Sequence, residues 1–94
     1  MKPIERDSSI ININEGISLI EKRLKDITDF ETYQSSLKQL HYLLSVLDGS
    51  EPDKSKLDKI IVGHFAVHEF EESDPELSKA LKKCQNIAFK LEME

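Results

Sequence analysis

Apolar side chains recur at alternating three- and four-residue steps through most of this sequence, and this spacing restricts the chain to helices. In the first segment the repeating residues are Ile10, Ile13, Ile17, Ile20, Leu24 and Ile27. In the second segment they are Tyr33, Leu37, Leu40, Leu44 and Leu47. Because this step places the apolar side chains on one helical face, it predicts amphipathic helices at about 9–27 and 30–48.

Polar joints mark the expected ends of the helices, at residues 28–29, 48–53 and 71–75. Asp29 is a plausible N-cap for the second helix, and Gly49 is a plausible C-terminal stop. The asparagines and the glycine in the early turns of the first segment weaken helix formation, so its start is the least defined of these boundaries.

The third segment, about 54–70, has no turn signal other than Gly63 and is longer than an ordinary strand. One helical face carries Leu57, Ile60, Ile61 and His64. Much of the remaining surface carries Val62, Phe65, Ala66 and Val67. Because apolar residues surround it, we expect this segment to be the central, most buried helix.

The fourth segment, about 74–91, has a clear start. Ser73 and Glu76 form a capping-box pattern, and Pro75 falls in the first turn, where its missing N–H is tolerated. The apolar stripe that follows consists of Leu77, Leu81, Cys84, Ala88 and Leu91. With no convincing strand in 94 residues, the sequence predicts an all-α fold, a small four-helix bundle-like single domain over residues 1–94.

The charge balance is acidic, with 13 Lys and Arg residues against 18 Asp and Glu and a formal charge of −5. An acidic surface repels nucleic acid and anionic lipid, so we expect a basic protein partner, with no nucleic acid and no membrane. Cys84 is the lone cysteine, which excludes an internal disulfide. No signal peptide is evident at residues 1–7, and the longest clean apolar run is residues 60–62. These features predict a cytoplasmic location.

No catalytic constellation is complete. Cys84 lies on an apolar stripe without a base to activate it. His64 and His68 are four residues apart, with Glu72 four further on, a spacing at which imidazoles can chelate one metal ion. Phe65 stands where a zinc protease has its glutamate. We therefore expect no enzyme, no cofactor and no metal, with a metal-dependent enzyme that uses these three residues as an alternative.

Carboxylates crowd the joint before the fourth helix, where Lys and Arg are absent from residues 69–76. The acidic residues are Glu69, Glu71, Glu72, Asp74 and Glu76. They form either a hydrated, capped helix start or a docking patch for a basic protein. Phe70 within this run is either an interface anchor or the last core residue of the third helix.

Residues 66–82 (AVHEFEESDPELSKALK) resemble immunity proteins of bacterial type VI secretion systems, specifically those that neutralise effectors with NAD(P)+ glycohydrolase activity. A second block agrees with the same family: residues 38–40, Tyr42 and residues 45–48. The two blocks cover about half of the chain.

The resemblance implies a small helical domain that binds the toxic C-terminal domain of a cognate effector and blocks its dinucleotide site. It requires no reaction and no cofactor of the immunity protein. The family-matched candidates for partner binding are Glu69, Phe70, Glu71, Asp74, Glu76 and Tyr42. A helical adaptor without a toxin partner is the alternative, and the two coiled-coil-like stripes leave a homodimer of the free protein open.

Overall fold

The computed structural model describes residues 2–94, and throughout this range the secondary structure is helical, without strands. The three long helices are α1 (Pro3–Asp26), α2 (Glu31–Asp48) and α4 (Pro75–Glu92). Between α2 and α4 lie a short 3-10 helix η1 (Leu57–Lys59), a short α3 (Val62–Phe65) and a π-helical turn η2 (Ala66–Phe70). The predicted all-α, bundle-like fold is confirmed.

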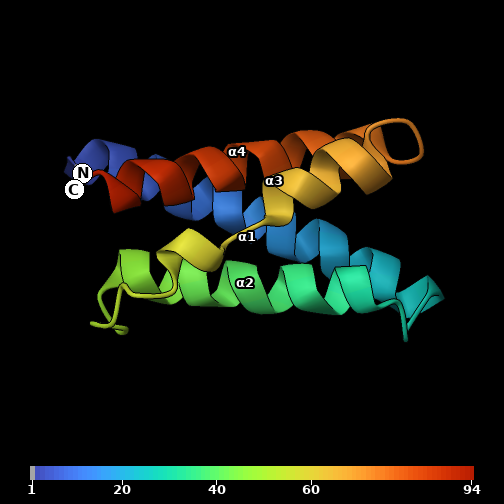
Figure 1. Ribbon diagram of the computed structural model, residues 1–94, viewed down its shortest axis with the longest axis horizontal. Helices are drawn as coiled ribbons and strands as arrows, with labels where there is room; N and C mark the ends of the chain where they lie inside the picture. Colours follow the sequence, from blue (N-terminus) through green and yellow to red (C-terminus); the bar gives the residue numbers. More distant parts are fainter. Residues whose placement is uncertain (1) are drawn as a thin grey trace.

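The helix α1 packs against both α2 and α4, so it forms the middle of the bundle (Figure 1). The short helices α3 and η2 pack on α4. The start of α1 and the end of α4 lie at one end of the bundle, and the joint between η2 and α4 lies at the opposite end (Figure 1). This joint is therefore well separated from the termini.

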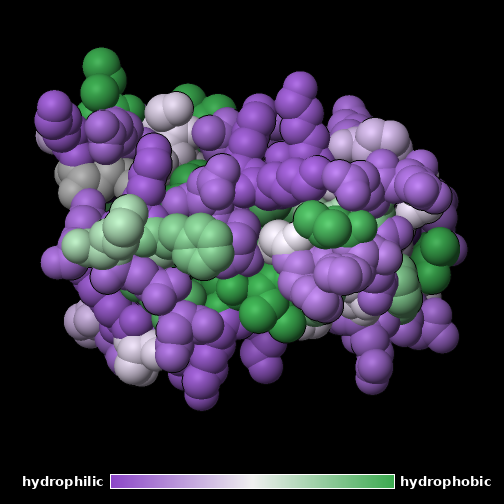
Figure 2. Space-filling view, turned by 45° about the horizontal axis from the view of Figure 1, so that its top comes forward, coloured by the Kyte–Doolittle hydropathy of each residue, from purple (hydrophilic) through white to green (hydrophobic). Residues whose placement is uncertain are grey.

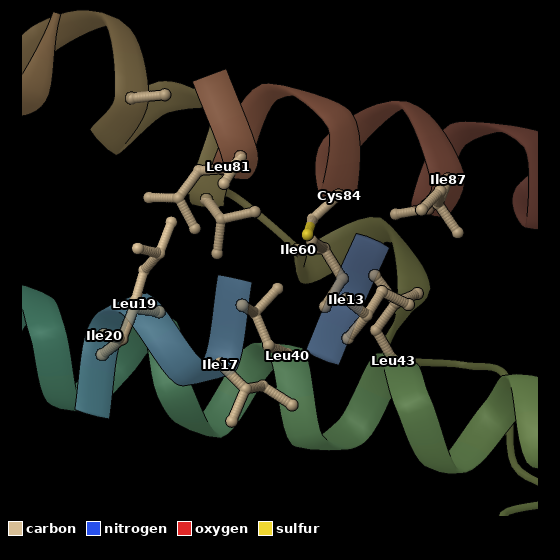
Figure 3. Packing of buried hydrophobic residues seen from close by; sticks show 14 of the residues in the cluster. Ile13, Ile17, Leu19, Ile20, Leu40, Leu43, Ile60, Leu81, Cys84 and Ile87 are labelled. Atoms are coloured by element: carbon tan, nitrogen blue, oxygen red, sulfur yellow. The ribbon is translucent and has the colours of Figure 1, made fainter. Parts of the chain in front are cut away.

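The core lies where the three long helices face one another. From α1, Ile13 and Ile20 are fully buried, and Leu40 of α2 and Leu81 of α4 are also fully buried. Figure 3 shows these side chains converging from the three helices, with Ile60 entering from the segment after η1. Burial of such side chains supplies most of the stabilisation of a small helical domain.

The first helix begins at Pro3 rather than near residue 9. Proline at the first helical position and Glu5 in the first turn are both helix-start signals, which the apolar stripe does not include. Asp29 is not the N-cap of α2. The carbonyl of Phe30 instead accepts the first backbone hydrogen bonds, from Tyr33 N at 3.1 Å and Gln34 N at 3.2 Å. Gly49 does end α2, in the left-handed conformation with φ 87°.

The predicted third helix, 54–70, is wrong in its first half. The chain forms η1 and then an irregular turn before α3 begins at Val62. In that turn, Gln39 of α2 accepts a hydrogen bond from Ile61 N at 2.7 Å. Gln85 of α4 accepts from Gly63 N at 2.9 Å and donates to Ile60 O at 2.8 Å. Side-chain amides thus take the place of a helical backbone ladder.

The most buried helix is α4, not the third segment. Every residue of its predicted stripe is buried, and so are Ser78, Ala80, Gln85 and Ile87. The helix begins at Pro75, one residue after the predicted start near residue 74, and its N-cap is Asp74, which accepts a hydrogen bond from Leu77 N. Ser73 instead donates its hydroxyl to Glu69 O at 2.9 Å. None of the helices described over residues 2–94 combines the length and apolarity that a membrane span needs.

Candidate partner-binding surface

The acidic joint, which consists of Glu69, Glu71, Glu72, Asp74 and Glu76, is the feature that the sequence singles out. In the structure it links η2 to α4 at one end of the bundle (Figure 1). Glu69 and Glu72 are exposed, and among residues 2–94 no ion pair engages either carboxylate. A shallow hollow of about 380 Å³ at the joint is lined by Val67, His68, Glu69, Glu71, Glu72 and Ser73. The joint therefore presents negative charge directly to water.

Glu71 differs from these two residues because α4 partly neutralises it. Its Oε1 accepts a hydrogen bond from Lys82 Nζ at 2.8 Å, which lowers the pKa of the Glu71 carboxyl. Both side chains are about half exposed, so water screens this pair. Glu71 can exchange Lys82 for a basic group on a partner at little energetic cost.

Asp74 has a structural role that its pattern does not reveal. Arg23 of α1 forms a two-pronged ion pair with it, at 2.9 Å to Oδ2 and 3.1 Å to Oδ1. The hydrogen bonds from Arg23 hold the pKa of Asp74 below its ordinary value, and they raise the pKa of Arg23. The same guanidinium reaches Glu76 at 3.0 Å, although Glu76 remains 69% exposed. Arg23 thus ties the start of α4 to the end of α1.

Phe70 is a core residue, only 3% exposed. Its ring stacks on Tyr33 of α2 with centroids 5.5 Å apart, and it meets Phe30 edge-on at 6.5 Å. The sequence left two roles open for Phe70, an interface anchor or the last core residue of the third segment. The packing supports the second role. Phe70 thus attaches the joint to the core, and the exposed carboxylates of the joint face away from the core.

Tyr42 lies on the same helix as Tyr33 but about 13 Å further along it, given a rise of about 1.5 Å per residue. Its hydroxyl donates to Asp53 O at 2.7 Å and accepts from Lys56 N at 3.3 Å. The pKa of Tyr42 is raised, chiefly by burial. The fold therefore does not bring Tyr42 together with the acidic joint. Tyr42 instead holds the loop after α2 through its two hydrogen bonds.

The three residues of the metal-enzyme alternative do not form a three-ligand site, although two of them lie together. His64 and His68 are both exposed, with ring centroids 4.2 Å apart. Across residues 2–94, no group of three or more His, Cys, Asp or Glu side chains is placed to hold a metal ion, so Glu72 does not complete such a site. Cys84 is fully buried, and desolvation raises the pKa of its thiol to about 12. A thiol in this environment stays protonated at neutral pH and is a poor nucleophile.

Sequence reasoning missed a second hollow, of about 630 Å³, between the start of α3 and the outer face of α4. Ile61 and Phe89 line it and remain 46% and 53% exposed. Figure 2 turns this side of the bundle towards the viewer and shows hydrophobic patches among polar side chains. One feature of the sequence could have indicated this hollow: Phe89 is a large apolar residue that lies outside the apolar stripe of its own helix.

Comparison with known proteins connects this chain to a family. The sequence matches the Tsi6 family over residues 9–90. It is 38% identical over 90 residues to the immune protein Tsi6 of Pseudomonas aeruginosa strain PAO1, with 96% of this chain and 89% of that protein covered. The fold is similar to a chain in the solved structure of Tse6 in complex with Tsi6, with a TM-score of 0.87, 36% identity and 90% of each chain covered.

A solved structure of Tsi6 from Pseudomonas aeruginosa gives a TM-score of 0.81 at 39% identity, with 85% of this chain and 83% of that chain covered. These matches confirm the family resemblance that two sequence blocks indicated, and they extend it to most of the chain. This chain therefore belongs to the Tsi6 family.

Proposed function

We propose that this protein is an immunity protein that binds and inhibits a cognate type VI secretion effector, an NAD(P)+ glycohydrolase, by occluding its active site. The observation that carries the proposal is the similarity, across nearly the whole fold, to a chain in a structure of Tse6 with Tsi6. In this role the protein acts in the cytoplasm as a binder and performs no reaction. Its acidic charge suits a partner whose site accepts an anionic dinucleotide.

The acidic joint is the proposed contact surface. An effector that binds a pyrophosphate group needs positive potential in its nucleotide cleft. Glu69 and Glu71 can approach that cleft as phosphate-like anions, with Glu76 at the edge of the same surface. Clustered carboxylates of this kind speed association and select the partner. Tyr42 remains a proposed second contact, at a distance along α2.

Phe70 and Asp74 support this surface from inside. Phe70 fixes the joint to the aromatic cluster, and Asp74 fixes it to Arg23 and caps α4. A joint held from below loses little conformational freedom when a partner binds, and this favours affinity. We therefore assign partner contact chiefly to the outer carboxylates and positioning to these two residues.

The proposed function is tested by mixing the purified protein with the toxin domain of its cognate effector. We expect a stable complex by size-exclusion chromatography and loss of NAD+ hydrolysis at equimolar ratio. The effector encoded beside this protein must be used, because specificity is a difference of affinities. Undiminished hydrolysis, with no complex at micromolar concentration, would reject the proposal for that effector.

The contact surface is tested by Glu69→Lys combined with Glu72→Lys, two exposed positions without ion pairs among the described residues. We expect effector affinity to fall by about tenfold or more, mainly through slower association. The matched control is Asp7→Lys with Glu92→Lys, which makes the same change of charge at exposed sites near the opposite end of the bundle. Equal affinities for the two double variants would remove the acidic joint from the mechanism.

A further inference from the structure

His64 and His68 form a pair that the proposed function does not use. The two rings lie on the outer side of α3 and η2, both exposed, with centroids 4.2 Å apart and planes inclined by 36°. The chain has three histidines, and the third, His41, lies apart from this pair on α2. A close pair of exposed imidazoles offers two nitrogen ligands from one short segment.

The spacing of the rings is close to what one metal ion requires. With Zn–N bonds of about 2.0–2.1 Å, two imidazoles at adjacent corners of a tetrahedron place their ring centroids roughly 5 Å apart. The observed separation is within reach of that value by small side-chain rotations. Two histidines one turn apart on a helix are the recurring way in which proteins present such a pair.

The backbone that carries the two rings is tied to α4 on both sides. Gly63, directly before His64, donates its N–H to Gln85 at 2.9 Å. Ala66, between the two histidines, accepts a hydrogen bond at its carbonyl from the Ser78 hydroxyl at 2.8 Å. An ion that binds the pair therefore orders only side chains, which keeps the entropic cost of binding low.

The surrounding charge also favours a cation. His64 lines one hollow together with Asp58, and His68 lines another together with Glu69, Glu71 and Glu72. Lys82 is the one Lys or Arg among the lining residues, and its ammonium group is paired with Glu71. The local field thus raises the concentration of divalent cations near the rings.

We propose that His64 and His68 together bind one divalent transition-metal ion, such as zinc, through two imidazole nitrogens and with water in the remaining positions. Imidazole suits Zn²⁺, Cu²⁺ and Ni²⁺, and the absence of a third side-chain ligand among residues 2–94 limits the site to these two. The ion clamps α3 to η2 and so stabilises the segment beside the acidic joint.

The test is a calorimetric titration of untagged protein with ZnCl₂. We expect one saturable site, and both His64→Gln and His68→Gln should weaken zinc binding by more than about tenfold. The matched control, His41→Gln, removes the isolated exposed histidine of α2 and should leave the titration unchanged. Circular dichroism of each variant checks that helicity is retained.

A second readout is thermal unfolding with and without zinc. The midpoint of the wild type should rise with zinc concentration, and the rise should disappear in the His64→Gln and His68→Gln variants. The proposal would be overturned if the wild type showed no saturable zinc binding. It would also be overturned if zinc binding were unchanged in both the His64→Gln and the His68→Gln variants. Loss of binding in His41→Gln would equally reject the pair as the site.

Discussion

The fourth helix and the third segment carry similar amounts of apolar sequence but form very different structures. In α4 the apolar residues follow one helical period, and all of the predicted stripe is buried against α1 and α3. In residues 54–70 the apolar residues surround the segment, and the chain breaks into η1, an irregular turn, α3 and the π turn η2. A single apolar stripe can be buried by one packing arrangement, whereas apolar side chains on all faces cannot be buried at the edge of a small domain.

The two regions are stabilised by different interactions. Packing stabilises α4, whose Leu77, Leu81 and Cys84 are fully buried. The turn at residues 60–63 depends on side-chain amides from other helices, namely Gln39 and Gln85. We therefore expect apolar truncations to have the largest effects in α4, and polar substitutions to have the largest effects around α3.

The largest predicted effect is that of Leu81→Ala, at the centre of α4. Leu81 is fully buried, so its truncation should lower the free energy of unfolding by about 2–5 kcal/mol through lost transfer energy and a cavity. Urea unfolding followed by circular dichroism measures this change. Phe89→Ala, on the exposed face of the same helix, is the control and should change stability far less. Similar losses in the two variants would mean that the α4 stripe does not form the core.

The next effect is that of Gln85→Leu, which keeps an apolar stem but removes the carboxamide. Gly63 N and Ile60 O then lose their hydrogen-bond partner, and the free energy of unfolding should fall by about 1–3 kcal/mol. The matched control is Gln39→Leu, whose single bond to Ile61 N lies at an exposed site where water can replace it. Urea unfolding and hydrogen exchange of the Gly63 amide report the result. If both leucine variants lose the same stability, the buried clamp has no special role.

The third prediction concerns the ion pair between α1 and α4. Arg23 lowers the pKa of Asp74 below its ordinary 3.8, so the pair stabilises the fold above that pH. This stabilisation is lost as the pH falls through the lower, folded-state pKa. Asp74→Asn keeps a capping side chain but loses the charge, and it should cost about 1 kcal/mol or less at neutral pH.

Urea unfolding at a series of pH values tests this prediction: the difference between wild type and Asp74→Asn should shrink as the pH falls below 3.8. Glu71→Gln is the comparison, since its pair with Lys82 is about half exposed and should contribute nothing measurable. A pH-independent difference for Asp74→Asn would show that the charge of Asp74 is not the source of the stability lost in this variant.

The smallest effect is that of Ser36→Ala. Ser36 is fully buried in α2, and among residues 2–94 its hydroxyl has no hydrogen-bond partner. Removal of this hydroxyl should leave stability unchanged or raise it by a few tenths of a kcal/mol. Ser78→Ala is the matched control, because its buried hydroxyl bonds to Ala66 O and its loss should destabilise by about 1 kcal/mol. Destabilisation by Ser36→Ala, measured by urea unfolding, would reveal a partner for that hydroxyl.

Local pattern predicted α2 and α4 well because each carries its own start signal, stop signal or stripe. Leu43 and Val46 of α2 were nevertheless missed as core residues, since α2 faces more than one neighbour. The amide clamps could not be predicted, because Gln39 and Gln85 meet residues 60–63 across 22 to 25 positions of sequence. Of the candidate site, the exposed carboxylates followed from composition, whereas the internal roles of Phe70 and Asp74 depend on partners in α1 and α2.

The sequence by itself determined an all-α fold, an acidic surface and membership of a protein family, since periodicity, charge and motif are all local properties of the chain. The tertiary structure decided which acidic side chains face water and which are tied down. Arg23 lies 51 positions from Asp74 and neutralises it only because α1 packs against α4. The spacing of His64 and His68 already indicated that their rings are neighbours, whereas only the tertiary structure decided that both rings are exposed to water.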